Sequence, residues 1–195
     1  PTDYVGVINQ ELGKRYATLV KMEPINEQET EFIYHMPTRA IIGLRSLLLT
    51  LTKGTAVFSS QILDYQPVGK AVPKLRSGVL TASSSGDALA YGLNAAEERG
   101  VLFIGPGTKV YEGMIVGKNS RNEDIAVNVC KGKKLTNMRS KSSDGVIQLA
   151  PPTILSLEQC LDFLEPDELL EITPESLRLR KKHLTELERK RAGKK

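Results

Sequence analysis

The sequence predicts an α+β fold in two parts: a split β-α-β unit without its first strand, followed by a strand-rich mixed unit. Three observations support this. Helical and strand periodicities alternate before residue 64, residues 68–77 have the proline and basic content of a linker, and short strand patterns separated by glycine turns follow. With 195 residues, 40% of them hydrophobic, the chain is long and apolar enough to bury real cores.

The first part, residues 1–76 including the linker, has the predicted order α-β-β-α-β. Its predicted elements are a helix over 3–14, strands over 16–22 and 29–36, a helix from Pro37 to Lys53, and a strand over 57–63. A turn around Pro24 and Asn26 separates the two strands. A split β-α-β arrangement needs one more strand in front. We therefore expect the chain to begin inside a domain, after its first strand, although a strand supplied by another chain would give the same pattern.

The second part, residues 77–195, is predicted to mix short strands with short helices. Its predicted elements are strands over 78–81, 101–104, 110–116 and 125–129, a helix over 87–99, a helix after Ser156, a hairpin of 169–172 and 177–179, and a final helix after Thr185. Gln159 and Glu188 each follow a hydroxyl residue by three positions, as in a capping box. Period-two alternation of leucine and arginine favours a strand over 177–180.

The net charge of +4 conceals strong segregation along the chain. Residues 109–141 hold eight basic and three acidic side chains, residues 144–177 hold eight acidic and no basic ones, and residues 178–195 hold nine basic and two acidic ones. Either the opposite blocks neutralise one another in the fold, or a basic block binds phosphates. No apolar run reaches the length of a membrane span, and no signal peptide is visible at the start of the sequence.

Signals for catalysis and metal binding are weak. His35 lies in a predicted strand and His183 lies among lysines and arginines, so both are expected to have a structural or surface role. Cys130 and Cys160 have neither a disulfide framework nor the neighbours of a zinc site. The sequence has no Gly-x-x-x-x-Gly-Lys-Ser/Thr loop. We therefore predict no catalytic residue, no metal ligand and no cofactor in this chain, and a reducing compartment.

The strongest functional signal is the segment 131–141, which has five basic residues and no acidic one. A long loop of this composition is suited to following a phosphate backbone. The alternative is a solvated loop that only aids solubility. Arg178, Arg180, Lys181 and Lys182 form a second basic cluster, and its alternative role is salt-bridging to the preceding acidic block.

Several motifs in the sequence resemble the C-terminal region of the TypA/BipA translational GTPases. They are Leu102-Phe103-Ile104-Gly105, Val110-Tyr111-Glu112-Gly113-Met114-Ile115-Val116-Gly117, Asn119-Ser120-Arg121, Leu135-Thr136-Asn137-Met138-Arg139, Glu171-Ile172-Thr173-Pro174 and Ser176-Leu177-Arg178-Leu179-Arg180-Lys181. Residues 1–76 resemble the ferredoxin-like fifth domain of elongation factor G, and residues 77–195 resemble the C-terminal domain particular to the family.

The resemblance implies a ribosome-binding C-terminal fragment. It implies contacts with large-subunit RNA and the tRNA acceptor end near the peptidyl-transferase centre, and roles in stress adaptation and large-subunit assembly. GTP and Mg²⁺ are expected only in an N-terminal domain that this sequence lacks, so the fragment itself is not expected to be an enzyme. Its expected partners are the ribosome and those N-terminal domains, without DNA or membrane, and its expected location is cytoplasmic and ribosome-associated, in a bacterium or an organelle.

The predicted RNA-binding residues combine both basic clusters with one family motif. They are Lys131, Lys133, Lys134, Asn137, Arg139, Lys141, Arg178, Arg180, Lys181, Lys182, Asn119 and Arg121. The alternative function is a protein-interaction module in which the acidic block 144–177 docks a basic partner.

Overall fold

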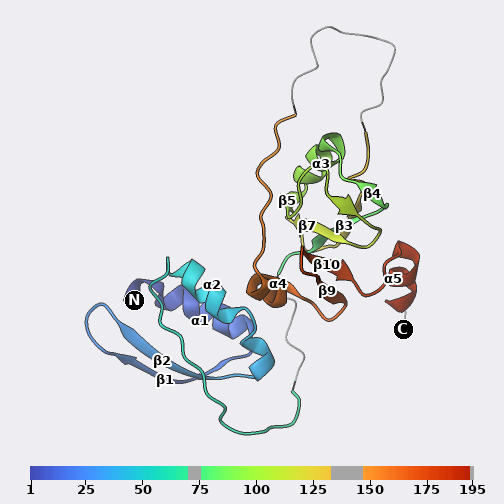
Figure 1. Cartoon of the computed structure of the whole chain (residues 1–195). Coiled ribbons are helices and arrows are strands. Elements are labelled where there is room, and N and C mark those ends of the chain that lie inside the picture. Colours follow the sequence, from blue (N-terminus) through green and yellow to red (C-terminus); the bar gives the residue numbers. More distant parts are fainter. Residues whose placement is uncertain (70–75, 133–146, 194–195) are drawn as a thin grey trace. The chain divides into compact units, whose positions relative to one another are not determined.

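The computed structural model describes residues 1–69, 76–132 and 147–193, and it contains two compact units, Pro1–Lys74 and Leu75–Lys195 (Figure 1). Each unit has its own buried apolar residues. Most of the basic segment 131–141, from Lys133 onward, lies outside the described residues.

The first unit consists of one antiparallel hairpin and two helices. Its elements are η1 (Thr2–Tyr4), α1 (Val5–Lys14), β1 (Thr18–Pro24), β2 (Thr30–His35), η2 (Thr38–Ala40) and α2 (Leu44–Leu51). The helices lie side by side on one side of the hairpin (Figure 1). The Asn26 side chain accepts hydrogen bonds from the backbone N–H groups of Gln28 and Glu29, which closes the hairpin turn. Leu12, Leu44 and Leu48 form the core of this unit.

Two predictions for the first unit are wrong. The helix expected from Pro37 to Lys53 is interrupted, because Gly43 has a φ of 68° and separates η2 from α2. The strand expected over 57–63 does not form, and the exposed side chain of Val57 contacts almost nothing. A strand needs a neighbour that accepts and donates its backbone hydrogen bonds, and among the described residues β1 and β2 pair only with each other.

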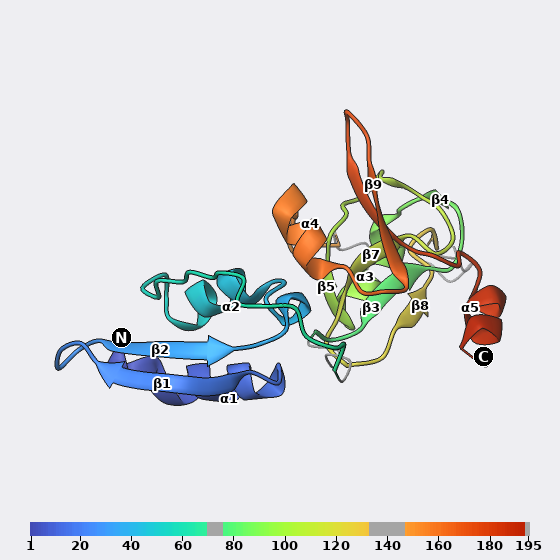
Figure 2. The same cartoon turned by 90° about the horizontal axis from the view of Figure 1, so that it is seen from below.

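The second unit is a three-layer arrangement around a four-stranded sheet. Its elements are β3 (Val79–Ala82), β4 (Gly86–Asp87), α3 (Ala90–Glu97), β5 (Gly100–Leu102), β6 (Lys109–Val110), β7 (Ile115–Asn119), β8 (Ile125–Val127), α4 (Leu157–Phe163), β9 (Glu168–Ile172), β10 (Leu177–Lys181) and α5 (Glu186–Ala192). The sheet order is β5-β7-β3-β8, with β3 and β8 parallel and the other neighbours antiparallel. Figure 2 shows the same unit from a second direction.

Both faces of this sheet are covered, because successive strand residues point to opposite sides. Leu80 and Val116 pack with Leu93 of α3 on one face. Val79 and Ile115 pack with residues of α4 and of the β9–β10 hairpin on the other face. Strands covered on both sides are buried at consecutive positions, as all four residues of β3 are.

Most of the predicted elements of this unit are confirmed, with local corrections. Both capping boxes form, at Ser156 with Gln159 and at Thr185 with Glu188. The predicted strand 110–116 is divided into β6 and β7, because Gly113 has a φ of 83°. The predicted helix 87–99 begins only at Ala90, since the two residues of β4 pair with β6 instead. The overall α+β class agrees with the prediction.

Candidate nucleic-acid interface

Lys131 is the described end of the basic segment 131–141. It follows β8 and is exposed, with Nζ 6.0 Å from the centroid of the Tyr91 ring on α3. At that distance the cation–π attraction is weak, so the ammonium group stays available to an anion. Lys133, Lys134, Asn137, Arg139 and Lys141 lie outside the described residues.

Lys181 has the structural role that the sequence left open as the alternative for its basic cluster. Its side chain is buried, and Nζ lies 2.6 Å from a carboxylate oxygen of Asp124, 2.8 Å from one of Asp167 and 2.9 Å from one of Glu168. Burial by itself lowers the pKa of Lys181, but hydrogen bonds to these carboxylates outweigh burial and hold the pKa above its ordinary value. The predicted RNA contact is corrected for this residue, because its charge is enclosed and neutralised within the protein.

Arg76 belongs to the same ion-pair network. Its guanidinium binds the fully buried Glu168 carboxylate, donates to the Phe163 carbonyl over 2.7 Å, and lies 4.2 Å from the centroid of the Phe163 ring. The network therefore ties the start of the second unit to α4 and β9. Arg76 was absent from the sequence-based set because nothing in the linker composition distinguished it from its basic neighbours.

Arg180 is also paired inside the second unit. Its Nε donates to Glu171 over 2.6 Å, and the same carboxylate accepts a 2.7 Å hydrogen bond from the Tyr111 hydroxyl. Burial, followed by the hydrogen bond to Glu171, raises the pKa of Tyr111. Arg180 is thus held against Glu171, and its predicted role in binding RNA is at most a supporting one.

Replacing Tyr111 with Phe is expected to reduce the loss of stability at alkaline pH. A tyrosine in the unfolded chain ionises near pH 10. Above that pH the unfolded chain releases a proton that the folded chain keeps, so the free energy of unfolding falls as the pH rises. Urea unfolding near pH 7 and near pH 11 should therefore show a smaller difference in Tyr111→Phe than in the parent chain. An equal difference in both proteins would contradict this assignment.

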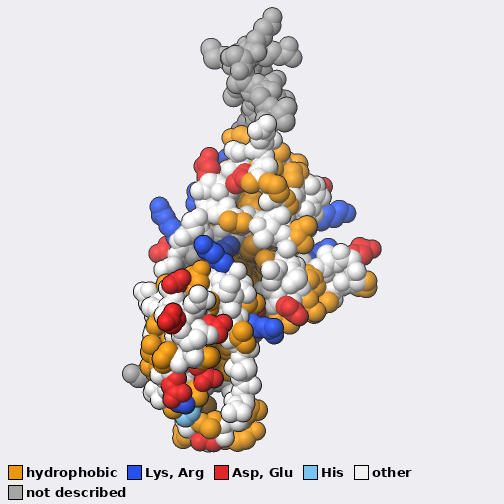
Figure 3. Space-filling view, turned by 90° about the vertical axis from the view of Figure 1, so that its left-hand side faces the viewer, with side chains coloured by type: hydrophobic (Ala, Val, Ile, Leu, Met, Phe, Trp, Pro, Cys, Tyr) orange, Lys and Arg blue, Asp and Glu red, His pale blue; other side chains and the backbone are white. Residues whose placement is uncertain are grey.

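At least half of the acidic side chains in the block 144–177 are engaged with basic residues of their own unit. At least four of the block's eight acidic side chains form ion pairs with Arg76, Arg180 or Lys181: Glu165, Asp167, Glu168 and Glu171. The alternative expectation of internal salt bridges is therefore confirmed for Arg180 and Lys181. Basic and acidic side chains are interspersed over the face of the molecule in Figure 3.

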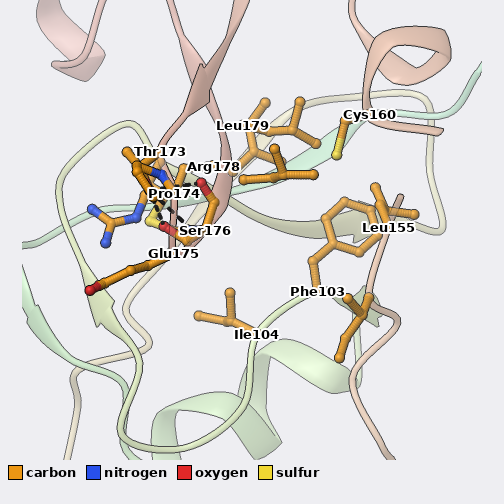
Figure 4. A pocket seen from close by; sticks show the side chains of 14 residues that line it. Phe103, Ile104, Leu155, Cys160, Thr173, Pro174, Glu175, Ser176, Arg178 and Leu179 are labelled. Atoms are coloured by element: carbon orange, nitrogen blue, oxygen red, sulfur yellow. Dashed lines mark hydrogen bonds between the residues drawn. The ribbon is translucent and has the colours of Figure 1, made fainter. Parts of the chain in front are cut away.

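Arg178 and Lys182 remain accessible. Lys182 is exposed at the end of β10, and Arg178 is half-buried on the face that it shares with Arg180. Arg178 lines a pocket of about 530 Å³ between the β9–β10 hairpin, α4 and the 103–104 segment. Figure 4 shows Arg178 and Glu175 on one side of this pocket and Phe103 and Leu155 on the other.

Asn119 is buried at the end of β7, so the predicted contact of its side chain with RNA is corrected as well. Its amide donates to the Glu123 carbonyl over 2.5 Å, and its Oδ1 accepts from the Arg121 N–H at 3.2 Å. These bonds shape the turn between β7 and β8. Arg121 itself is exposed on that turn and stays in the predicted set.

Within the described ranges, no group of three or more His, Cys, Asp or Glu side chains could hold a metal ion. Nor does any helix in those ranges have the length and apolar character needed to cross a membrane.

Comparison with known proteins identifies the relatives of both units. Residues 77–186 match the model of the TypA/BipA C-terminal domain, and residues 1–76 match that of the elongation factor G C-terminus. The proteins named large ribosomal subunit assembly factor BipA from Salmonella typhimurium and from Escherichia coli K12 are each 43% identical over 189 residues, which is 96% of this chain and 31% of theirs. The Bacillus subtilis protein of that name is 40% identical over 196 residues, covering 100% of this chain and 32% of its own. The chain thus spans about a third of the length of these curated relatives.

Proposed function

Because this chain belongs to the TypA/BipA family, we propose that it binds the large ribosomal subunit and takes part in its assembly. The observation that carries the proposal is the 40–43% identity, over nearly the whole chain, to proteins named as assembly factors of that subunit. The match of residues 1–76 to the C-terminus of elongation factor G adds a second likeness to a translation factor.

The basic segment 131–141 is the proposed lead contact with ribosomal RNA and with the acceptor end of tRNA, near the peptidyl-transferase centre. Lys131, Lys133, Lys134, Arg139 and Lys141 supply charge for phosphates, and Asn137 supplies an amide donor. The accessible side chains of Arg121, Arg178 and Lys182 support them. Phosphate contacts of this kind orient a protein on RNA, and shape and 2′-hydroxyl contacts add selectivity.

The proposed role of this chain is binding without catalysis. GTP hydrolysis, with its Mg²⁺, is assigned to a domain of the family whose phosphate-binding motif this sequence does not contain. A GTPase assay on the chain, with and without ribosomes, is expected to show only the background rate. A stress-related role at the ribosome, in the cytoplasm or an organelle, is part of the same proposal.

Reversing three charges in the basic segment is expected to abolish most ribosome binding. The variant Lys133→Glu, Lys134→Glu, Arg139→Glu removes three phosphate contacts and places three like charges beside the RNA. Co-sedimentation with purified bacterial large subunits should show an affinity loss on the order of a hundredfold at low salt. The matched control Lys133→Arg, Lys134→Arg, Arg139→Lys keeps every charge and should bind like the parent chain. Unchanged ribosome binding by the charge-reversal variant would contradict the assignment of the basic segment 131–141 as the lead RNA contact.

The rival function, a protein-interaction module built on the acidic block, is less favoured because much of that block is neutralised internally. Titration of naked ribosomal RNA separates the two. The RNA-binding proposal requires affinity that falls steeply with salt, and the rival requires no RNA binding at any ionic strength.

A further inference from the structure

The edge of the four-stranded sheet where β5 pairs with β7 carries a further group of basic residues. Lys118 is the exposed position of β7 and pairs with Val101 of β5. Arg99 precedes β5, and its carbonyl accepts a 2.9 Å hydrogen bond from the Ser120 N–H. Arg121 follows directly, with its carbonyl bonded at 2.8 Å to the Gly78 N–H at the start of β3. Two chain segments, the one entering β5 and the one leaving β7, therefore bring these three cations to one edge.

These charges differ from those of Arg76, Arg180 and Lys181 in having no ion-pair partner among the described residues. Arg99, Lys118 and Arg121 are exposed, and within the part of the chain that the structure describes none of them forms an ion pair, in contrast to Arg76, Arg180 and Lys181. Glu98 and Glu123 are their sequence neighbours, but neither carboxylate binds any of the three in that part of the chain. The cations are thus free to meet an anion from outside.

A hydroxyl without a partner lies in the same place. A shallow pocket of about 250 Å³ is lined by Ser77, Lys118 and Ser120, together with Val101 and Asn119. The Ser77 Oγ atom is buried and has no hydrogen-bond partner among the described residues. Buried hydroxyls are nearly always hydrogen-bonded, and a phosphate oxygen seated beside Lys118 would accept from this one once the Ser77 side chain turns toward the pocket.

The backbone beneath this edge is closely packed. A Cβ atom at Gly100 would overlap the Lys118 carbonyl, and one at Gly78 would overlap the Glu123 carbonyl. The buried Asn119 amide further braces the adjoining turn. Charges held on strands and a braced turn are better positioned for a fixed phosphate spacing than charges on a free loop.

We propose that Arg99, Lys118 and Arg121, with the Ser77 hydroxyl, form a second phosphate-binding site that contacts the backbone of RNA. The inference rests on the proposed ribosomal RNA binding and adds to it a site distinct in sequence from 131–141. The site would set the orientation of the second unit on the RNA without reading its sequence, because phosphates carry no base information.

The test is the salt dependence of RNA binding by the full chain, measured by fluorescence anisotropy with a labelled ribosomal RNA hairpin. The variant Arg99→Gln, Lys118→Gln, Arg121→Gln should bind on the order of tenfold more weakly at low salt. The slope of log affinity against log salt should fall in magnitude by roughly two to three. The control Lys109→Gln removes an exposed charge from β6, outside this edge, and should stay within about twofold of the parent chain.

A second variant, Ser77→Ala, should weaken binding by a few-fold without changing the salt slope, since it removes a neutral donor. Thermal unfolding of each variant checks that the fold is kept. If the parent chain binds the hairpin but the triple variant matches it in slope and affinity, the second site is wrong and the proposed function stands. Equal losses in the triple variant and in Lys109→Gln would also overturn the site. No binding by the parent chain would overturn both.

Discussion

Replacing Lys181 with Met is expected to lower the free energy of unfolding of the second unit by about 3 to 5 kcal/mol. The substitution keeps the aliphatic stem but removes the cation shared by Asp124, Asp167 and Glu168. Glu168 is fully buried, and its Oε2 atom would keep Arg76 and the Glu165 N–H as donors, whereas its Oε1 atom would lose Lys181. A buried carboxylate oxygen that loses its cation regains no hydration in its place. Urea unfolding of the full chain, followed by circular dichroism, measures the loss.

Lys182→Met is the matched control for this experiment. Lys182 is the next residue along the chain and is exposed, so its substitution should change stability by no more than about 0.5 kcal/mol. A loss of less than about 1 kcal/mol in Lys181→Met would show that the network does not need its central cation. The double variant Lys181→Met, Glu168→Gln should recover part of the stability, because it removes the buried charge as well.

Gly113→Ala is expected to destabilise the second unit by about 3 kcal/mol or more, through two additive causes. Gly113 has a φ of 83°, which L-residues with a Cβ atom rarely adopt. A Cβ atom there would also stand 2.5 Å from the Leu184 carbonyl oxygen and 2.7 Å from its Cα atom, so the backbone that leads into α5 would have to move. The same urea experiment measures the change.

Gly107→Ala separates these two causes. Gly107 has a similar φ of 80°, but a Cβ atom would meet nothing within 4 Å. Its substitution should therefore cost only the backbone strain, about 1 to 2 kcal/mol. Equal costs at Gly107 and Gly113 would contradict the proposed contact with Leu184.

Local chemistry explains the elements that were predicted well. The capping boxes of α4 and α5 depend on side chains three residues apart, and both form as expected. The β9–β10 hairpin follows from period-two alternation around Thr173 and Ser176, whose side chains hydrogen-bond across the turn. In each case the residues that decide the structure are close in sequence.

The elements predicted wrongly depend on distant partners. Residues 57–63 have the pattern of a strand, but no described neighbour completes their hydrogen bonds. Strand 110–116 is divided because the chain must turn at Gly113 to admit the backbone of Leu184, more than 70 residues away. Neither requirement is visible in a local window of sequence.

In the candidate site, too, local sequence predicted some features and distant partners decided others. Alternation correctly predicted that Arg178 and Arg180 share a strand face, but it could not show that Glu171 would engage Arg180 and leave Arg178 at a pocket. Arg121 at the β5–β7 edge was predicted, but Arg99 and Lys118 were missed for the same reason, since only strand pairing brings their segments together.

The sequence by itself determined the α+β class, the capped starts of α4 and α5, the family resemblance and the segregation of charge. These depend on residue type and short-range spacing, which a single chain displays directly. Only the tertiary structure decided which cations form ion pairs inside the protein and which remain exposed for a partner. That choice follows from burial: Lys181 is enclosed with carboxylates from two other segments, while Arg99, Lys118 and Arg121 lie on an exposed edge, where water or a phosphate can reach them.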